Sequence, residues 1–317
     1  MIPNSLPFDA SHGYDQACLL CVGSPPPPDD FAAFWQARYA RALQVDPRPM
    51  LKGSNIHHEG YHIYDCGYTS TDHFGIGGWL LIPKDKPVKR GFIISHGYSG
   101  REGPDLDLPV PAGSALLFPC CRGISRSAHP PISTDPYWHV LHDIHRVDRY
   151  ILGGCVEDIW LGVSTLLTLY PWIAGHIGYM GISFGGGIGA MAIPWDHRIT
   201  RGHLNIPSFG NHPLRVTLPS HGSSASVARF QAEHGTALQT LRYYDAATAA
   251  RFITIPMHLA VAAFDPVVPP PGQYAILNAI PSEKHYFALT AGHHPYPKEA
   301  AERRSMRSGL KQFFATL

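Results

Sequence analysis

The chain has no uninterrupted run of 18 or more apolar residues, which is the length that a membrane-spanning helix requires. Its first thirty residues also lack the basic segment and the apolar stretch that together make a secretory signal. We therefore expect no membrane partner, and a cytoplasmic location is the default expectation.

Charged residues are scarce and balanced in sign. Only 15% of the residues are charged, and 25 basic against 24 acidic side chains leave a formal net charge of +1. This balance gives no reason to expect nucleic acid or an anionic membrane surface as a partner. By contrast, 44% of the 317 residues are hydrophobic, which is enough to bury a sizeable core and argues against intrinsic disorder.

Cysteines are too few for a disulfide framework, because the chain has only six of them in 317 residues. Cys18 and Cys21 form a single C-x-x-C motif. A redox site or half of a zinc site would use this motif, but no second pair follows at zinc spacing. We favour buried or partly buried thiols instead.

Histidine is abundant, yet no metal site follows from its pattern. The densest group outside the motifs described below is His57, His58 and His62. A metal site needs further carboxylate or imidazole partners, so this group is interpreted as a polar loop that leads into a strand. We predict neither a metal nor a cofactor.

Apolar patterns predict strands that alternate with helical stretches. Residues 1–28 end in four prolines and are expected to form a stiff, extended arm. Residues 29–317 are expected to form a single domain. Alternation of this kind, without an internal repeat, predicts an α/β fold with one doubly wound, largely parallel sheet. Strands are expected at 61–68, 78–83, 91–95, 114–118, 176–180, 202–206, 257–262 and 284–290, with a glycine-rich turn at 75–78. Helices are expected at 29–45, capped by the carboxylates of Asp29 and Asp30, at 155–170, at 224–244 with an interruption near Gly235, and at 298–314.

The clearest of these helices covers residues 155–170, where apolar residues recur every three or four positions. Glu157 and Asp158 are expected in its first turn, where the helix dipole favours acidic side chains. The proline-rich residues 124–150 are expected to form a long excursion over the edge of the sheet that roofs a pocket.

Residues 181–185, Gly-Ile-Ser-Phe-Gly, match the G-x-S-x-G pattern between a predicted strand and a buried helix. A serine at such a turn has a strained backbone, and only small residues fit on either side of it. This context predicts a nucleophile elbow with Ser183 as the nucleophile. An ordinary glycine-rich turn is the alternative.

Two backbone amides near this serine are candidates for an oxyanion hole. Phe184 follows the serine at the start of a helix, where backbone N–H groups have no partner in the helix. Tyr98 lies in the loop His-Gly-Tyr-Ser-Gly at 96–100, directly after the strand 91–95. Hydrolases of this type place their second donor in such a loop; a plain turn is the alternative.

A serine hydroxyl becomes reactive only when a base removes its proton and an acid orients that base. Asp265 directly follows the buried strand 257–262, and it is favoured over Asp196 and Asp245, which have no buried strand before them. His293 follows the last strand and is favoured over His294, because the preceding glycine allows a tight turn.

With these residues assembled, the chain resembles the acetyl xylan esterase and cephalosporin C deacetylase family of α/β-hydrolases. The resemblance runs through most of the chain: the entry segment 30–35, the loop 96–100, the Arg-Gly pair at 122–123, the elbow, Asp265 and the Gly-His pair at 292–293. It implies Ser183 as nucleophile, His293 as base and Asp265 as acid. It further implies metal-free deacetylation of small acetylated sugars by a ring-like homo-oligomer with buried active sites.

Four positions depart from the family pattern. Ile124 and Ser125 replace the last two residues of the R-G-Q-G motif, Phe184 replaces a glutamine after the serine, and His294 replaces a glutamate after the base. Arg122, Ile124 and His294 are the expected pocket residues. Ile124 and Phe184 make the expected pocket more apolar than the family pattern, which would favour a different acyl or alcohol group.

The sequence thus predicts a serine carboxylesterase that removes acetyl groups from acetylated sugars or related small esters. The same residues would also serve hydrolysis of another ester, a lactone or a peptide bond. Two other classes remain open, namely a hydrolase fold without activity that acts as a binding or assembly module, and a thiol or metal protein that uses Cys18 and Cys21.

Overall fold

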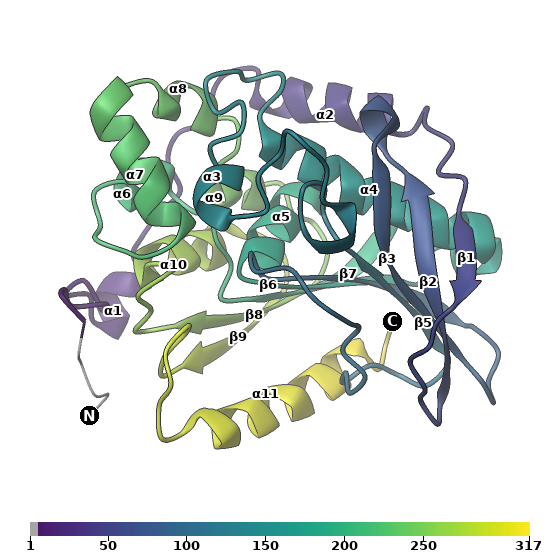
Figure 1. Ribbon diagram of the computed structural model, residues 1–317. Helices are drawn as coiled ribbons and strands as arrows, with labels where there is room; N and C mark the ends of the chain where they lie inside the picture. The colour runs from purple at the N-terminus through teal and green to yellow at the C-terminus, as the bar shows by residue number, and fades with distance from the viewer. Residues whose placement is uncertain (1–5) are drawn as a thin grey trace.

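The structure is a computed structural model that describes residues 6–317. Its centre is a nine-stranded sheet with the strand order β1-β2-β3-β5-β4-β6-β7-β8-β9 (Figure 1). The strands are β1 Met50–Gly53, β2 Tyr61–Thr69, β3 Gly75–Pro83, β4 Arg90–Ser95, β5 Ser114–Pro119, β6 Ile177–Ile182, β7 Ile199–Asn205, β8 Met257–Ala262 and β9 Lys284–Leu289.

The sheet is antiparallel at one edge and parallel elsewhere. β1, β2, β3 and β5 pair antiparallel in that order, whereas β5, β4, β6, β7, β8 and β9 are parallel neighbours. The doubly wound, mostly parallel sheet predicted from the sequence is therefore confirmed. Because parallel strands end at the same edge, the loops after β4, β6, β8 and β9 all gather there.

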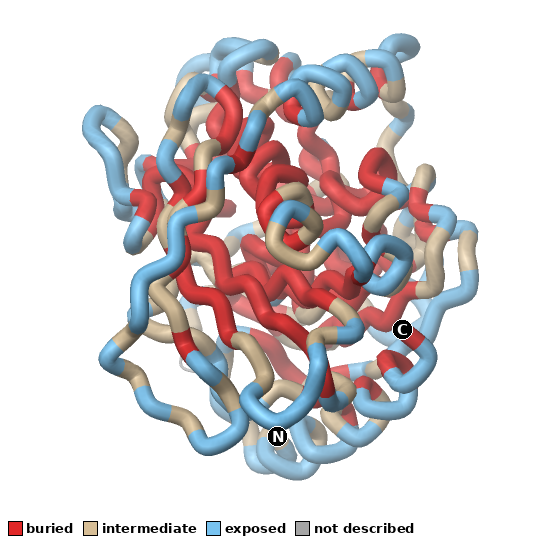
Figure 2. The backbone as a smooth tube through the Cα atoms, turned by 90° about the vertical axis from the view of Figure 1, so that its right-hand side faces the viewer, coloured by how far each residue is buried: buried red, intermediate tan, exposed pale blue. Residues whose placement is uncertain are grey.

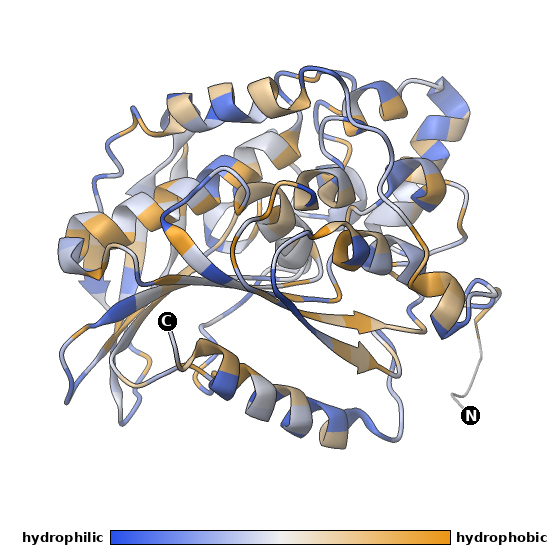
Figure 3. Ribbon diagram, turned by 180° about the vertical axis from the view of Figure 1, so that it is seen from behind, coloured by the Kyte–Doolittle hydropathy of each residue, from blue (hydrophilic) through white to orange (hydrophobic). Residues whose placement is uncertain are grey.

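Helices cover both faces of this sheet. The helices are α1 Gln16–Leu19, α2 Phe31–Ala42, α3 Pro136–His139, α4 Ile151–Leu169, α5 Phe184–Ala192, α6 His212–Arg215, α7 Ser223–His234, α8 Ala237–Leu241, α9 Ala246–Ala250, α10 Pro270–Ala279 and α11 Glu299–Phe314, with short 3₁₀ turns η1 Thr71–His73, η2 Ser125–Ser127 and η3 Pro171–Ile173. Figure 3 shows α11 alone beneath the sheet, with hydrophilic and hydrophobic residues along its length.

The direction of each crossover explains this division. The connections after β5, β6, β7 and β8 all step the same way along the sheet, so right-handed crossovers place α4, α5, α9 and α10 on one face. Only β4 to β5 steps the other way. Its connection, residues 96–113, contains no helix, so α11 is the main cover of the second face.

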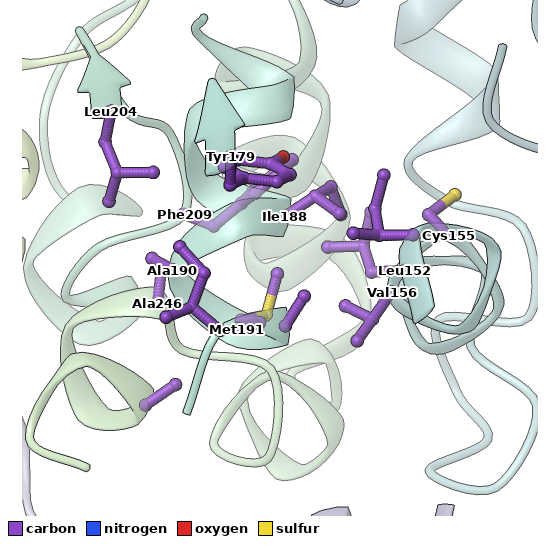
Figure 4. Close-up of a cluster of buried hydrophobic side chains, with 14 of the residues drawn as sticks. Leu152, Cys155, Val156, Tyr179, Ile188, Ala190, Met191, Leu204, Phe209 and Ala246 are labelled. Carbon is purple, nitrogen blue, oxygen red and sulfur yellow. The ribbon is translucent and has the colours of Figure 1, made fainter. Parts of the chain in front are cut away.

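The larger core lies between the sheet and the helices α4 and α5, where buried side chains of both helices meet those of β6 and β7 (Figure 4). Figure 2 shows the buried segments running through the middle of the sheet and of these helices. Among the described residues, α4 is the one helix long and apolar enough to span a membrane, and most of it is buried inside the domain. Packing in the core therefore accounts for its apolar composition.

The helix α4 begins at Ile151, four residues before the predicted start. Glu157 and Asp158 therefore lie beyond its first turn, where the helix dipole no longer favours acidic side chains. Both are fully buried and are instead bound by arginines, Glu157 by Arg38 and Asp158 by Arg122. The predicted cap of α2 also differs, because Asp30 makes no cap hydrogen bond and accepts one from a distant tyrosine instead.

The first segment of the chain is packed rather than extended. Residues 1–5 lie outside the described part of the chain, but residues 6–28 contain α1 and bury Ala10 and Leu19 completely. The predicted stiff arm is therefore wrong for these residues, because apolar side chains between the prolines contact the core. Similarly, residues 75–78, expected to be a turn, form the start of β3, and the turn is η1 instead.

Candidate active site

The backbone at Ser183 is strained in the way that a nucleophile elbow requires. Ser183 links β6 to α5 with φ 55° and ψ −112°, a backbone conformation that residues other than glycine rarely adopt. A Cβ atom on Gly181 would lie 2.4 Å from the carbonyl oxygen of Gly185, and one on Gly185 would lie 2.8 Å from the carbonyl oxygen of His96. Both flanking glycines are therefore needed for close backbone approach.

Three predicted side chains form one hydrogen-bonded line. The Nε2 atom of His293 lies 3.0 Å from the Oγ of Ser183, and its Nδ1 lies 2.8 Å from Oδ2 of Asp265. Ser183 is 7% exposed and Asp265 is fully buried, whereas the side chain of His293 is 24% exposed. A carboxylate accepts a hydrogen bond from Nδ1–H of the imidazole, which leaves Nε2 free to accept the proton of the serine hydroxyl.

Asp265 is held by several donors besides the imidazole. The backbone N–H groups of Val267 and Val268 each donate to its Oδ1 at 2.9 Å. The side-chain amide of Gln273 donates to Oδ2 at 3.0 Å, and the N–H of Asp265 itself donates to the carbonyl of Ala10. These bonds fix the carboxylate and compensate for its burial.

Glycine at position 292 serves a different purpose from the one expected. Gly292 was expected to allow a tight turn, but the residue with left-handed backbone here is His293 itself, with φ 47°. A Cβ atom on Gly292 would lie 2.4 Å from Oδ2 of Asp265. The glycine therefore leaves room for the carboxylate that holds the imidazole.

The alternative acids and base lie elsewhere. Asp196 pairs with Arg198, and Asp245 accepts backbone N–H bonds at the start of α9. The ring of His294 meets that of Phe264 edge to face, and His293 rather than His294 reaches the serine.

The two predicted oxyanion donors lie beside the elbow. The N–H of Gly185 donates to the carbonyl of His96, which joins the loop 96–100 to the start of α5. The rings of Tyr98 and Phe184 are in contact, tilted by 41° with centroids 4.4 Å apart. Within residues 6–317, neither the Tyr98 amide nor the Phe184 amide donates to another protein group. Both are thus available to a developing negative charge on a substrate oxygen.

Two histidines that sequence reasoning missed hold this loop in place. The Nδ1 of His96 donates to the carbonyl of Gly97, and its Nε2 accepts from the N–H of Cys121 at the end of β5. The Nδ1 of His139 on α3 accepts from the hydroxyl of Tyr98 at 2.9 Å. Burial lowers the pKa of His139 to about 4, so this ring is neutral at pH 7. A position directly after a buried strand was the only available signal for His96.

A cleft of about 550 Å³ begins at His293 and extends between α11 and the carboxyl ends of the strands. Its lining combines apolar side chains of the sheet and of α11 with charged residues at the rim. Ile182, beside the serine, is 41% exposed and belongs to this lining together with His294. The cleft lies on the face of the sheet that α11 covers, where the connection 96–113 contributes no helix.

The three predicted pocket residues are not brought together. His294 lines the cleft at His293. Arg122 lines a separate cavity of about 780 Å³ between α2 and the excursion 124–150, and its guanidinium binds Asp158. Ile124 is 2% exposed and lines neither cavity. The excursion itself is irregular apart from η2 and α3, as expected.

The expectation of buried or partly buried thiols is wrong for the C-x-x-C motif. Cys18 and Cys21 are exposed rather than buried, because α1 presents only one side, with Leu19, to the core. In the described part of the chain, no three His, Cys, Asp or Glu side chains gather closely enough to bind a metal ion.

A mixed, mostly parallel sheet, a serine at a strained strand-to-helix turn, and the order Ser, Asp, His along the chain together define an α/β-hydrolase. Solved structures with the same fold include acetyl xylan esterase 1 from Thermoanaerobacterium sp. JW/SL YS485, with a TM-score of 0.79, 19% identity and coverage of 97% of this chain and 100% of that one. Another is the acetyl xylan esterase from Paenibacillus sp. R4, with a TM-score of 0.80, 20% identity and coverage of 93% and 99%.

Other solved structures match this chain with lower TM-scores and cover less of it. The acylaminoacyl peptidase of Pyrococcus horikoshii has a TM-score of 0.61 and 15% identity, and the match covers 81% of this chain but 42% of the peptidase. The sequence model of the family described as acetyl xylan esterase (AXE1) matches residues 21–308. The chain belongs to the acetyl xylan esterase family, and it is a carboxylic ester hydrolase of the serine type.

Proposed function

We propose that this protein removes acetyl groups from acetylated sugars or related small esters by way of an acyl-enzyme. The observation that carries the proposal is the hydrogen-bonded line from Ser183 through His293 to Asp265. Membership of the acetyl xylan esterase family supports the acetyl ester as the bond that is cleaved.

The geometry assigns a role to each group. The Oγ of Ser183 attacks the ester carbonyl while Nε2 of His293 takes its proton, and Asp265 stabilises the imidazolium. The amides of Tyr98 and Phe184 would bind the oxyanion. Collapse of the tetrahedral intermediate breaks the bond to the alcohol, which leaves with the proton from Nε2. Water then attacks the acetyl-serine by the same route and releases acetate.

The cleft beside His293 gives the alcohol part of the ester a place to bind. The leaving oxygen must come within hydrogen-bond distance of Nε2 to receive its proton, and His293 lines this cleft. Charged residues at the rim, Asp105, Glu299 and Arg303, suit a polyhydroxylated alcohol. We therefore propose that the sugar lies in the cleft and the acetyl group on the side of Tyr98 and Phe184.

Ser183→Ala tests this function against a panel of esters. We expect kcat for acetyl esters to fall by up to about 10⁶-fold, because the three residues act as a unit. Ser305→Ala, an exposed position on α11, is the matched control and should hydrolyse at the normal rate. The panel compares acetylated xylo-oligosaccharides, butyryl and octanoyl esters, a lactone and an acylated peptide. Undiminished hydrolysis by Ser183→Ala would overturn the proposal, and a preference for peptide would redirect it.

Assembly and location remain predictions of the sequence. A homo-oligomer, a cytoplasmic location and a small-molecule ester as the main partner are the proposals that accompany this function. Gel filtration with light scattering measures the first, and the elution of a single monomer of 34.8 kDa would contradict it.

A further inference from the structure

A glutamine side chain is buried directly behind the candidate catalytic acid. Gln273 lies in α10 and has no exposed surface. Its Oε1 accepts from the N–H of Ala262 at 2.8 Å, and its Nε2 donates to Oδ2 of Asp265 at 3.0 Å and to the carbonyl of Val268 at 2.7 Å. The side chain therefore joins the end of β8, the loop after it and the carboxylate.

The orientation of this amide is determined by its partners. The N–H of Ala262 can only donate, so the oxygen of Gln273 must face it. The nitrogen then necessarily faces Asp265 and the carbonyl of Val268, which can only accept. A flipped amide would place its NH₂ group against the N–H of Ala262, and its oxygen against the oxygens of Asp265 and Val268. Neither arrangement can form a hydrogen bond, so the flipped amide is excluded.

The two carboxylate oxygens of Asp265 have different supporting donors. Oδ1 receives the two backbone N–H groups of Val267 and Val268, which any residue except proline would supply in this turn. The Nδ1 of His293 lies 3.1 Å from Oδ1 but closer to Oδ2, at 2.8 Å, and Oδ2 also accepts from Gln273. The glutamine is thus the side chain that fixes the oxygen to which the imidazole binds more closely.

We propose that Gln273 is a positioning residue for hydrolysis, which holds Oδ2 of Asp265 against Nδ1 of His293 and disperses part of the carboxylate charge. This inference rests on the proposed function. Gln273 does not contact the substrate, because it is fully buried. Its loss should therefore lower kcat and leave KM nearly unchanged.

Loss of the donor should also change the pH profile. A carboxylate with one hydrogen bond fewer attracts the imidazolium more strongly, so the acidic limb of kcat/KM should move to higher pH. A second titratable group that interacts with Asp265 is His12, from the packed N-terminal segment, and burial lowers the pKa of His12. No substitution at position 273 removes His12, so its contribution is common to all variants.

The main test compares Gln273→Met with a matched control, Asn278→Leu. Asn278 lies on the same helix and also donates two hydrogen bonds, to the carbonyls of Leu19 and Val22, but it does not reach Asp265. Both variants lose side-chain amide hydrogen bonds, which are buried at Gln273 and partly buried at Asn278. We expect Gln273→Met to lower kcat by about 10- to 100-fold, as small displacements of catalytic groups do, and to shift the acidic limb. Asn278→Leu should leave both unchanged.

Gln273→Glu keeps the shape and serves if Gln273→Met fails to fold. When protonated, the introduced carboxyl can accept from Ala262 and donate to Asp265, so the activity of this variant relative to that of the wild type at the same pH should rise as pH falls. Normal kcat and a normal acidic limb in Gln273→Met, or an equal loss in Asn278→Leu, would overturn the inference. If Ser183→Ala is also fully active, the proposed function has failed; if Ser183→Ala is inactive, only the role of Gln273 has failed.

Discussion

Two buried aspartates of this protein have opposite surroundings. Asp158 on α4 is bound by the guanidinium of Arg122 at 2.7 Å, by the N–H of Arg122 at 2.8 Å and by the hydroxyl of Ser70 at 2.7 Å. Asp265 is equally buried, yet within residues 6–317 its ion-pair partner is an imidazole, His293, which carries charge only when protonated.

The difference separates stability from chemistry. Arg122 is always charged, and nearby Asp158 raises its pKa further even though burial opposes the charge. The opposite charges of Arg122 and Asp158 therefore always compensate each other, and the pair holds α4 to the sheet. Asp265 gains a full counter-charge only when His293 takes the proton of Ser183, so its interaction energy is largest during the reaction. Substitutions at the two sites should consequently affect different measurements.

Asp265→Asn gives the largest expected effect. An asparagine can present its NH₂ group to the imidazole and stabilise the wrong tautomer, and it cannot stabilise the imidazolium, so kcat should fall by about 10⁴-fold. The free energy of unfolding should change less than this, because the asparagine oxygen still accepts from Val267 and Val268 and the amide of Gln273 loses only one of its two acceptors. Steady-state kinetics and urea denaturation on the same preparation measure both quantities. A loss of stability without loss of kcat would reverse the comparison.

Arg122→Met should show the opposite result. Removal of the guanidinium leaves Asp158 buried without its cation, which costs about 3–5 kcal/mol in the free energy of unfolding. The kcat of the folded fraction should stay within a few-fold of the wild type. Arg303→Met, on the exposed side of α11, is the control and should change stability by less than about 1 kcal/mol. Inactive but fully stable Arg122→Met would show that this arginine belongs to the reaction.

Gly292→Ala tests how closely the acid must be held. The added methyl group would meet Oδ2 of Asp265 at 2.4 Å, so the carboxylate or the loop must shift. We expect about 100-fold lower kcat, as for a displacement of about 1 Å. Gly309→Ala, in the middle of α11, is the matched control, because its Cβ atom would lie 3.9 Å from Nε2 of His258, at ordinary contact distance. The substitution should stabilise the helix by about 0.5–1 kcal/mol. Equal activity of both variants would contradict the argument.

His139 sharpens the comparison through pH. Its pKa is lowered to about 4 in the folded protein and is about 6.5 when unfolded. As pH falls below about 6.5, the unfolded chain takes up the proton first, so stability is lost progressively until about pH 4. Between pH 7.5 and 5 the share of His139 should be about 2 kcal/mol.

His139→Gln isolates that share, because His203 and His258, whose pKa values are also lowered by burial, remain in the variant. Denaturant unfolding at the two pH values gives the measurement. The variant should lose less stability than the wild type on acidification. An identical loss in both proteins would show that His139 does not titrate with unfolding.

The sequence could reveal features that depend on local patterns. Buried strands, the elbow and the positions of Asp265 and His293 after strands were all predicted, because each follows from periodicity and from the order of parallel strands. The short antiparallel edge strand β1 was missed, because its four residues are all exposed. The break between α7 and α8 was placed correctly at Gly235, where φ is 70°.

Contacts between distant segments could not be predicted in the same way. The pairing of Asp158 with Arg122 joins residues 36 positions apart, and the same carboxylate was interpreted as a helix-dipole partner. Gln273 gave no signal, because a glutamine in a proline-rich helix start looks like a surface residue. The packing of residues 6–28 likewise depends on partners such as Asp265 and Asn278, late in the chain.

Labelling with a fluorophosphonate tests the central claim most directly, because the probe reacts only with a serine that is activated by its neighbours. Intact-mass analysis and peptide mapping should show one equivalent bound at Ser183, none in Ser183→Ala, and a much slower reaction in Asp265→Asn. Labelling at another residue, or no labelling of a preparation that hydrolyses acetyl esters, would contradict the account.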